Sequence, residues 1–245
     1  MSSPSESVFT FNSSNPDALI SIFNDSSESL RAQNGRLLVT VSETELALAL
    51  MDKKRNAFLA LEVFIKKHEG DQQWLQSATS KSILLKEQAF DSSSVAIVNS
   101  FFTVVPSALF QEEDKREYVQ FNFNTEDMII KSDKVSSYEA VNVYALSELM
   151  NNNIETFFKN SITYHHTTPL LAGVQLAYGK FNRKTITVNV RPGSIDVVVT
   201  EGRKLILINS FFYKAIDDVL YYILFVADRL QLNPSNIHLV LTGQV

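Results

Sequence analysis

The stretch TITVNVRPGSIDVVVTEGRKLILINSFFY (residues 185–213) contains three apolar segments separated by two turns. Apolar and polar side chains alternate in its first segment, and Pro192-Gly193 and Gly202 lie in the turns. A period of two is typical of β-strands, and Gly and Pro mark the ends of such elements. The stretch therefore predicts a three-stranded antiparallel meander.

The same order of elements occurs earlier in the chain, as RLLVTVSETELALALM (residues 36–51), the polar turn DKKRN and the segment FLALEVFIKK. When Val39 is aligned with Val188, the apolar side chains of the next segment are aligned as well. The aligned pairs are Leu46 with Ile195, Leu48 with Val197, Leu50 with Val199 and, after the second turn is shortened by two residues, Leu61 with Ile208 and Phe64 with Phe211. We predict that residues 36–64 and 185–212 are duplicated meanders. The alternative is that any two meanders share such a pattern.

A helix is predicted after each meander, over Asp71–Phe90 and over Lys214–Leu232. Apolar side chains recur at helical spacing in the second of these, and Asp217 and Asp218 suit the positive N-terminal end of a helix dipole. Its near-apolar run Val219–Ala227 predicts a buried helix, and it is too short for the roughly 20 residues that cross a bilayer. The segment IHLVL follows and is expected to be a strand parallel to the meander.

Several further elements are predicted between the two meanders, and together they indicate α/β units with mixed sheets. The expected strands are VAIVNSFFTVV (95–105), EYVQFNFN (117–124), AVNVYAL (140–146) and SITYH (161–165), and the expected helices are Ser147–Lys159 and Pro169–Tyr178.

Composition excludes several classes of function. The 245 residues include 22 Lys and Arg against 27 Asp and Glu, which gives a net charge of −5, with 45% hydrophobic residues and no cysteine. A mildly acidic chain without a basic block is not expected to bind nucleic acid. The absence of cysteine excludes disulfides, thiolate metal sites and cysteine nucleophiles, and it fits a reducing compartment such as the cytoplasm. The seven glycines never lie closer than six positions, so neither GxGxxG nor GxxxxGK occurs.

The first 35 residues are rich in Ser, Asn, Asp and Pro and are predicted to form a loosely structured extension. They have neither the basic start nor the apolar run of a signal peptide. We therefore expect a soluble, cytoplasmic protein without membrane insertion.

The order meander, helix, strand, helix, strand, helix resembles the ribonuclease-H-like unit, two copies of which form the actin-like ATPase fold. The stretch HHTTPLLAGVQLAYG is similar to the crossover helix between the halves of such proteins. The segments FLALEVF, TVVPSALF, VNVYAL and residues 204–243 resemble the bacterial family known as domain of unknown function 3822. This resemblance implies duplicated ribonuclease-H-like halves at residues 36–180 and 181–245, with mixed sheets flanked by helices, but no reaction.

Actin-like ATPases carry a D-x-G motif in the turn after the first strand of each half, where the backbone holds phosphate and the Asp orients Mg²⁺ or water. The corresponding residues here are Thr40 and Ser42 in the first half, and Asn189 and Arg191 in the second. The paired glycines of the adenosine side are reduced to Gly243. The resemblance therefore predicts a degenerate nucleotide site with no phosphate cradle between the halves, no catalytic or metal-binding residues and no cofactor. Only Arg191 offers a compensating positive charge.

Four other groups of residues are candidate sites, each with a simpler interpretation. His165 and His166 are adjacent on a predicted strand, so their side chains should point to opposite faces and not share a metal. Ser92-Ser93-Ser94 lacks the glycines of a nucleophile elbow and is expected to be a solvated turn. Glu112-Glu113-Asp114 is expected to be a charged loop. Asp217 and Asp218 diverge by about 100° on a helix, so complementation of the helix dipole explains them.

The aromatic doublets, such as Phe101-Phe102, Phe157-Phe158, Phe211-Phe212 and Tyr221-Tyr222, place a ring on each side of their element. Phe121 and Phe123 alternate with polar residues, as in a half-buried strand. Core packing explains most such rings, but some must be exposed and would serve a protein-binding surface.

Two hypotheses of function follow. The first is a non-catalytic interaction or scaffolding protein with an unidentified protein partner. The alternative is a divergent ATP-binding actin-like ATPase, and a hydrolase of unrelated type is a distant third. We also expect Val240 and Leu241 to lie on a sheet edge, because actin-like halves continue with at least one more helix and strand.

Overall fold

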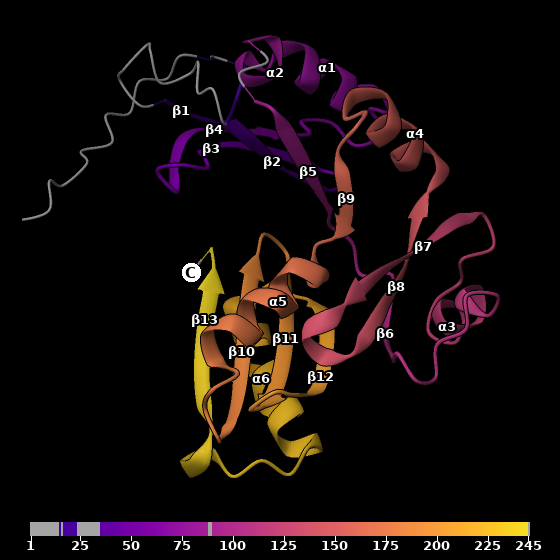
Figure 1. Ribbon diagram of the computed structural model, residues 1–245, viewed down its shortest axis with the longest axis vertical. Helices are drawn as coiled ribbons and strands as arrows, with labels where there is room; N and C mark the ends of the chain where they lie inside the picture. Colours follow the sequence, from indigo (N-terminus) through magenta and orange to yellow (C-terminus); the bar gives the residue numbers. More distant parts are fainter. Residues whose placement is uncertain (1–14, 16, 24–34, 88–89, 245) are drawn as a thin grey trace, which may run out of the picture. The chain divides into compact units, whose positions relative to one another are not determined.

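The computed structural model describes residues 15, 17–23, 35–87 and 90–244, and the chain forms two compact units (Figure 1). The first unit comprises the described residues up to Asn99 together with Leu146–His166, and the second comprises Ser100–Ala145 and the chain from Thr167 onward. This division concerns packing, whereas the sequence-based boundary at residue 180 concerns duplication. Residues 100–145 precede that boundary, yet they pack with the second meander.

The first unit is built on a six-stranded mixed sheet with the order β1-β4-β3-β2-β5-β9. Its strands are β1 (Ile20–Phe23), β2 (Gly35–Val41), β3 (Glu45–Asp52), β4 (Ala57–Ile65), β5 (Ser92–Ile97) and β9 (Ile162–His165). β1 to β4 pair antiparallel in the order of the sheet, and β5 and β9 continue it parallel to β2. Its helices are α1 (Trp74–Lys81), α2 (Ile83–Glu87) and α4 (Glu148–Phe157).

The second unit contains a four-stranded sheet with the order β12-β11-β10-β13 and a three-stranded sheet with the order β6-β8-β7. The strands of the larger sheet are β10 (Lys184–Arg191), β11 (Ser194–Glu201), β12 (Lys204–Phe212) and β13 (His238–Gly243), and those of the smaller are β6 (Phe102–Pro106), β7 (Met128–Val135) and β8 (Ala140–Ser147). The helices are α3 (Lys115–Gln120), α5 (Thr167–Tyr178) and α6 (Ile216–Arg229), with 3₁₀ turns at Ser136–Tyr138 and Pro234–Asn236.

The two meanders share strand order and register. In the first meander Val39 pairs with Leu48, and in the second Val188 pairs with Val197, as the aligned sequences predict. The next strand pairs parallel with the first strand in both units, as β5 on β2 and β13 on β10. These pairings confirm the predicted repeat and the predicted fold class.

A β-bulge lies at the same place in both meanders. It follows Leu50 where β3 pairs with β4, and it follows Val199 where β11 pairs with β12. Leu50 and Val199 are equivalent in the sequence alignment. Because a bulge increases local twist and bends its strand, both meanders bend at the same point.

The prediction of a loosely structured extension over residues 1–35 is wrong for its described part. Ile20–Phe23 form β1, which pairs antiparallel with β4. Asn15 is buried, and its amide donates to the Glu62 carboxylate at 2.7 Å and to the Lys81 carbonyl at 3.0 Å. The remainder of the predicted extension lies outside the described residues.

The helix predicted over Asp71–Phe90 is instead two helices that are separated at Ser82. This residue has an extended backbone, with ψ 127°, and its buried hydroxyl donates to the Glu62 carboxylate at 2.6 Å. The Ser82 hydroxyl also accepts the N–H of Leu85 and so caps α2. The helical periodicity of the sequence continues across Ser82. The break in the helix is therefore explained by the long-range contact of Ser82 with Glu62.

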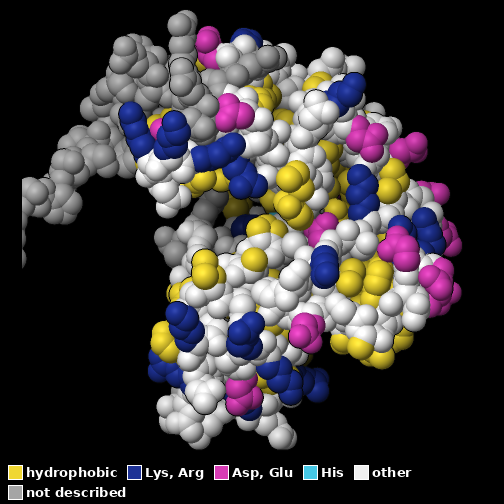
Figure 2. All heavy atoms as spheres, in the orientation of Figure 1, with side chains coloured by type: hydrophobic (Ala, Val, Ile, Leu, Met, Phe, Trp, Pro, Cys, Tyr) yellow, Lys and Arg dark blue, Asp and Glu magenta, His cyan; other side chains and the backbone are white. Residues whose placement is uncertain are grey.

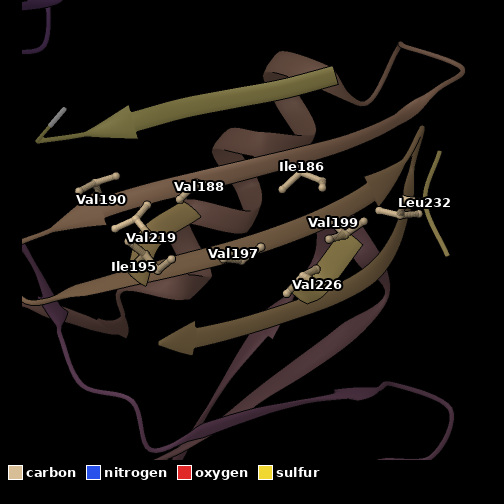
Figure 3. Close-up of a cluster of buried hydrophobic side chains, with 9 residues drawn as sticks. All are labelled: Ile186, Val188, Val190, Ile195, Val197, Val199, Val219, Val226 and Leu232. Carbon is tan, nitrogen blue, oxygen red and sulfur yellow. The ribbon is translucent and has the colours of Figure 1, made fainter. Parts of the chain in front are cut away.

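The core of the larger sheet in the second unit lies between the meander and α6. Figure 3 shows that Val219 and Val226 of α6 point towards side chains of β10 and β11. Burying one such aliphatic side chain contributes about 1.5–3 kcal/mol to the free energy of folding. The helical spacing of apolar residues predicted a helix over Lys214–Leu232, which is close to the observed bounds of α6, Ile216–Arg229.

The prediction that α6 is buried is wrong for one of its faces. Opposite Val219 and Val226, five apolar side chains are exposed. They are Ile216, Leu220, Tyr221, Leu224 and Phe225. No other described element covers that face, so α6 is a surface helix with an apolar outer side.

Two of the predicted strands between the meanders differ from the observed structure. The stretch 95–105 forms parts of β5 and β6, which belong to different sheets. The stretch 117–124 is not a strand, because Lys115–Gln120 form α3. Phe121 is 90% exposed just beyond the helix, whereas Phe123 packs edge-on against Phe101. The alternation of apolar and polar residues in this stretch thus comes from a six-residue helix followed by a loop, not from a strand. The sequence pattern did not predict β7.

Candidate functional site

The turn after β2, where the first D-x-G motif would lie, is closed by its own hydrogen bonds. The Ser42 hydroxyl accepts the N–H groups of Thr44 and Glu45 at 3.1 and 2.9 Å, and the Ser42 N–H donates to the Glu45 carbonyl. Thr40 is exposed on β2 and has no carboxylate. The N–H groups of this turn are thus used to close the hairpin.

The equivalent turn in the second unit is organised around a carboxylate. Asp196 on β11 is fully buried, and it accepts hydrogen bonds from Asn189 at 3.1 Å, from Arg191 at 2.8 Å and from the Ser210 hydroxyl at 2.5 Å. Asn189 and Arg191 are the residues at the second D-x-G position. Their side chains therefore bind Asp196, and the compensating charge of Arg191 is neutralised by an ion pair.

Asp196 is not among the candidate site residues predicted from the sequence, although the sequence does indicate its contact with Asn189. Arg191 and Ser194 flank the two-residue turn Pro192-Gly193, and a hairpin of that length pairs Asn189 with Asp196. A charged residue in the apolar segment SIDVVV, opposite a polar residue, predicts such a buried contact.

Gly243, which the resemblance places at the position of the adenosine-side glycine pair, is needed for close packing. A Cβ atom at this position would lie 2.1 Å from the Val190 carbonyl oxygen, and the residue has φ +88°. The following Gln244 N–H donates to the same carbonyl at 2.9 Å. Only glycine allows the end of β13 to approach β10 this closely.

His165 and His166 do not point to opposite faces as predicted. β9 ends at His165, and the two ring centroids are 4.4 Å apart. Both rings are buried, with His165 Nε2 3.3 Å from Asn99 Oδ1 and His166 Nδ1 3.3 Å from the Ile97 carbonyl. In the described part of the chain, no group of three His, Asp or Glu side chains is placed to hold a metal ion.

The serine run Ser92-Ser93-Ser94 is not the solvated turn that was expected. It begins β5, where Ser93 bonds Ser161 at 2.6 Å and Ser94 accepts from Arg36 at 2.7 Å. The hydroxyls of Ser93 and Ser94 therefore connect neighbouring strands of the sheet.

The acidic run Glu112-Glu113-Asp114 forms the turn before α3, and Lys115 pairs with Glu112 at 2.6 Å. Figure 2 shows both acidic and basic side chains over this part of the molecule. This is a charged surface turn in which both signs are present.

Asp217 and Asp218 differ in role at the start of α6. The Asp218 carboxylate accepts the N–H groups of Ala215 and Lys214 at 3.0 and 2.8 Å, and these bonds hold its pKa below the ordinary value of 3.8. Asp217 makes no such bond among the described residues. Helix capping thus accounts for Asp218, whereas the sequence predicted complementation of the helix dipole for both residues.

A buried polar cluster beneath α5 was missed by sequence analysis. Asp133 on β7 accepts from Thr168 at 2.8 Å and from the Tyr144 hydroxyl at 3.4 Å, and Asn142 donates to Thr167 and Thr168. Burial, together with the Asp133 charge, raises the pKa of Tyr144. These contacts tie the first turn of α5 to the smaller sheet, so the cluster has a structural role.

A comparison with protein families matches residues 24–245 to the family described as "Protein of unknown function (DUF3822)". The chain belongs to the DUF3822 family. The match confirms the resemblance that the sequence suggested, and it assigns no reaction to the DUF3822 chain.

Solved structures show the fold of the DUF3822 chain. A Bacteroides thetaiotaomicron VPI-5482 protein with an actin-like ATPase fold and unknown function is 21% identical, with a TM-score of 0.80 over 88% of this chain and 84% of that one. The PilM-PilN type IV pilus biogenesis complex contains a similar chain that is 14% identical, with a TM-score of 0.52 over 81% of this chain and 66% of that one. No curated protein matches the sequence significantly.

Two described surfaces in the second unit of the DUF3822 chain have no structural explanation. One is the apolar outer face of α6. The other is a groove of about 990 Å³ that is lined by β6, by β12 and by the 3₁₀ turn Ser136–Tyr138. In the described residues, no helix is long and apolar enough to cross a membrane.

Proposed function

We propose that this protein is a non-catalytic interaction or scaffolding protein on an actin-like ATPase fold, and that its partner is another protein. The proposal includes a cytoplasmic location, which a chain without cysteine suits, and it includes neither nucleic acid nor membrane insertion. The positions that hold nucleotide in related folds have, in this proposal, become structural.

The observation that carries the non-catalytic part is the contact of Arg191 and Asn189 with Asp196. A phosphate would have to compete with a buried carboxylate that already accepts from both side chains. Because like charges repel strongly at low dielectric, Asp196 also disfavours a nearby anion. The Arg191 charge is therefore already balanced by Asp196, which weakens its attraction for a nucleotide.

The exposed face of α6 supports the interaction part of the proposal. Leu220, Tyr221 and Leu224 are each more than half exposed and lie together on the helix. Phe212, at the end of β12, is 68% exposed, whereas its neighbour Phe211 stacks on Tyr222 with ring centroids 4.5 Å apart. Phe212 therefore lies on the opposite face of the sheet, and the contiguous apolar side chains of α6 form the kind of surface that commonly marks a protein-binding site.

The name of one structural neighbour fits this proposal. The PilM-PilN complex contains an actin-like chain assembled with a second protein. At 14% identity this likeness shows the fold alone, and it does not identify a partner for the present chain.

A pair of experiments tests the two parts separately. Calorimetry with Mg-ATP at millimolar concentration is expected to show no binding to the full chain, and stoichiometric binding would overturn the non-catalytic part. For the interaction part, a photo-crosslinking amino acid replaces Leu224 in the native cell, and the matched control replaces Leu176, which is 85% exposed on α5. A protein crosslink at position 224 alone is expected. Equal crosslinking at both positions, or none at 224, would contradict a role for the α6 face.

A further inference from the structure

The groove in the second unit lies between the edge strands of two different sheets. β6 is the outer strand of the three-stranded sheet, and β12 is the outer strand of the four-stranded sheet. Val104 of β6 and Ile206 and Ile208 of β12 are among the residues that line the groove. Each strand pairs on one side only within the described residues. An exposed strand edge is a template for pairing with another extended chain.

The register shows which backbone groups of β12 point into the groove. The Tyr213 N–H donates to the Gly193 carbonyl of the preceding strand connection, so Tyr213 faces β11. Along an antiparallel pair, the N–H and C=O groups of successive residues point alternately towards the partner strand and away from it. The N–H and C=O groups of Ile208 and Phe212 therefore face away from β11. Ile208 lies in the groove and Phe212 does not.

The backbone groups of β6 alternate in the same way between β8 and the open edge. The Ala145 N–H donates to the Phe101 carbonyl and the Ser107 N–H donates to the Glu139 carbonyl, so residues of this parity face β8. The backbone groups of Val104 consequently face the open edge. Among the described residues, Val104 and Ile208 thus each direct a backbone N–H and C=O away from the paired strand and into the groove.

The charge at one end of the groove indicates what kind of chain fits it. Arg203 and Lys204 are exposed, line the groove at the start of β12 and form no ion pair with another described residue, and together with Glu139 they give the lining a net positive charge. Val104 and Ile208, which pack against the buried apolar cluster beneath α5, and Ile206, which packs against the core beneath α6, supply part of its apolar lining. An occupant with alternating apolar side chains and an acidic end would complement both features.

We propose that this groove binds an extended peptide segment of a partner protein, which adds to the edge of β12 and places acidic residues beside Arg203 and Lys204. Main-chain hydrogen bonds to Ile208 supply affinity, and the apolar lining and basic end supply specificity. The proposal rests on the proposed interaction function and adds the chemical class of the partner.

The test starts from a displayed library of random decapeptides that is selected against the full chain, and the best peptide is synthesised. The selected sequences are expected to alternate apolar and polar residues and to carry Asp or Glu at one end. Failure of the selection to yield any binding peptide would overturn the proposal, as would selected peptides without acidic residues.

Two variants locate the binding. Ile208→Pro removes an N–H that faces the groove and keeps the bonds to β11, because proline is tolerated on the open side of an edge strand. It is expected to weaken binding of the selected peptide at least tenfold, whereas Phe212→Pro, the same change at the same parity outside the groove, leaves it unchanged. Equal effects of the two substitutions would overturn the proposal.

A charge variant keeps the test valid if Ile208→Pro fails to fold. Arg203→Glu combined with Lys204→Glu is expected to weaken the peptide at least tenfold at low salt and to remove most of the salt dependence. Its control, Lys159→Glu combined with Lys180→Glu, changes exposed cations outside the groove. Equal affinity of the two double variants would contradict the basic end of the site.

Size-exclusion chromatography of the full chain examines the other possible occupant. A dimer that Arg203→Glu with Lys204→Glu dissociates would assign the groove to a second copy and overturn the proposal. These outcomes are distinct from failure of the proposed function, because binding of Mg-ATP has no bearing on the peptide. A result that excludes peptide binding in the groove would not change the crosslinking expected at Leu224 of α6.

Discussion

Arg191 and Asp196 form an ion pair in which Nη2 lies 2.8 Å from Oδ1 and the Asp196 side chain is completely buried. The pair spans a two-residue hairpin turn, and Ser210 from β12 donates to the same carboxylate oxygen. It thereby links all three strands of the second meander at the end where related folds bind phosphate.

Asp196→Ala is expected to destabilise the protein by roughly 3–5 kcal/mol, because it leaves the Arg191 charge without a partner. Urea unfolding at pH 7 measures this change. Asp196→Asn keeps one acceptor oxygen and should lose less. If the midpoint of urea unfolding is the same for Asp196→Ala as for the wild type, Asp196 does not stabilise this hairpin.

Gly243→Ala should detach the end of β13, since the new Cβ would overlap the Val190 carbonyl oxygen. The control is Gly193→Ala, where φ is +73° but no atom lies within 4 Å of the added Cβ. A positive φ alone costs about 1 kcal/mol. Hydrogen exchange of the Val240 and Thr242 amides, which share the parity of the bonded Gln244 N–H, is expected to accelerate in Gly243→Ala only. Comparable exchange in the two variants would show that the close approach to β10 is unimportant.

Glu62→Gln should destabilise the first unit by about 1–3 kcal/mol. All groups around this buried carboxylate are donors, from Asn15, Ser82, Ile83 and Leu84. A glutamine NH₂ would therefore face a donor and leave it unpaired. Glu201→Gln, at an exposed strand end, serves as the control and should change the thermal unfolding midpoint little.

The Asp218 cap predicts a pH-dependent contribution to stability. The pKa of Asp218 is lower in the folded state than its ordinary value of 3.8, because backbone N–H groups bind the ionised form. Its contribution is therefore present above that value and is lost as the pH falls through the folded pKa. The difference in melting temperature between wild type and Asp218→Ala should be present at pH 7 and shrink below pH of about 4. Asp217→Ala should show no comparable dependence, and a constant difference for Asp218→Ala would argue against the cap.

The two faces of α6 should respond oppositely to a polar substitution. Leu224→Ser is expected to change the free energy of unfolding by less than about 0.5 kcal/mol. Val226→Ser, on the buried face, should lose about 2–3 kcal/mol of apolar burial. Urea unfolding with an unchanged m-value distinguishes them. A large loss in Leu224→Ser would mean that its side chain is covered.

Sequence patterns predicted the parts of the fold that depend on local periodicity. Alternation aligned Val39 with Val188, and the observed registers reproduce that alignment down to the bulges after Leu50 and Val199. Helical spacing located α6 but not its exposure, since the face around Leu224 is as apolar as the face around Val226. Periodicity reports side-chain type, whereas exposure also depends on what packs against each face.

The errors have a common physical origin in contacts between distant residues. Ser82 interrupts a helical pattern because its hydroxyl binds Glu62, twenty positions earlier. α3 is only six residues long, so it provides too little repeat to be distinguished from a strand. At the candidate site, the missing carboxylates and glycines were readable from the sequence. The contact of Arg191 with Asp196 required the hairpin register as well.

The division into units has a consequence for the order in which the protein forms during synthesis. The chain passes from one unit to the other after Asn99, after Ala145 and again after His166. A ribosome therefore completes the first unit before the second has received its larger sheet. In the interval, the stretch Ser100–Ala145 has emerged with β6 and β8, whose eventual neighbours in α5 and the second meander do not yet exist. Nascent β6, with an open edge, is then the segment most exposed to wrong pairing, and we expect this stage to depend most on chaperones.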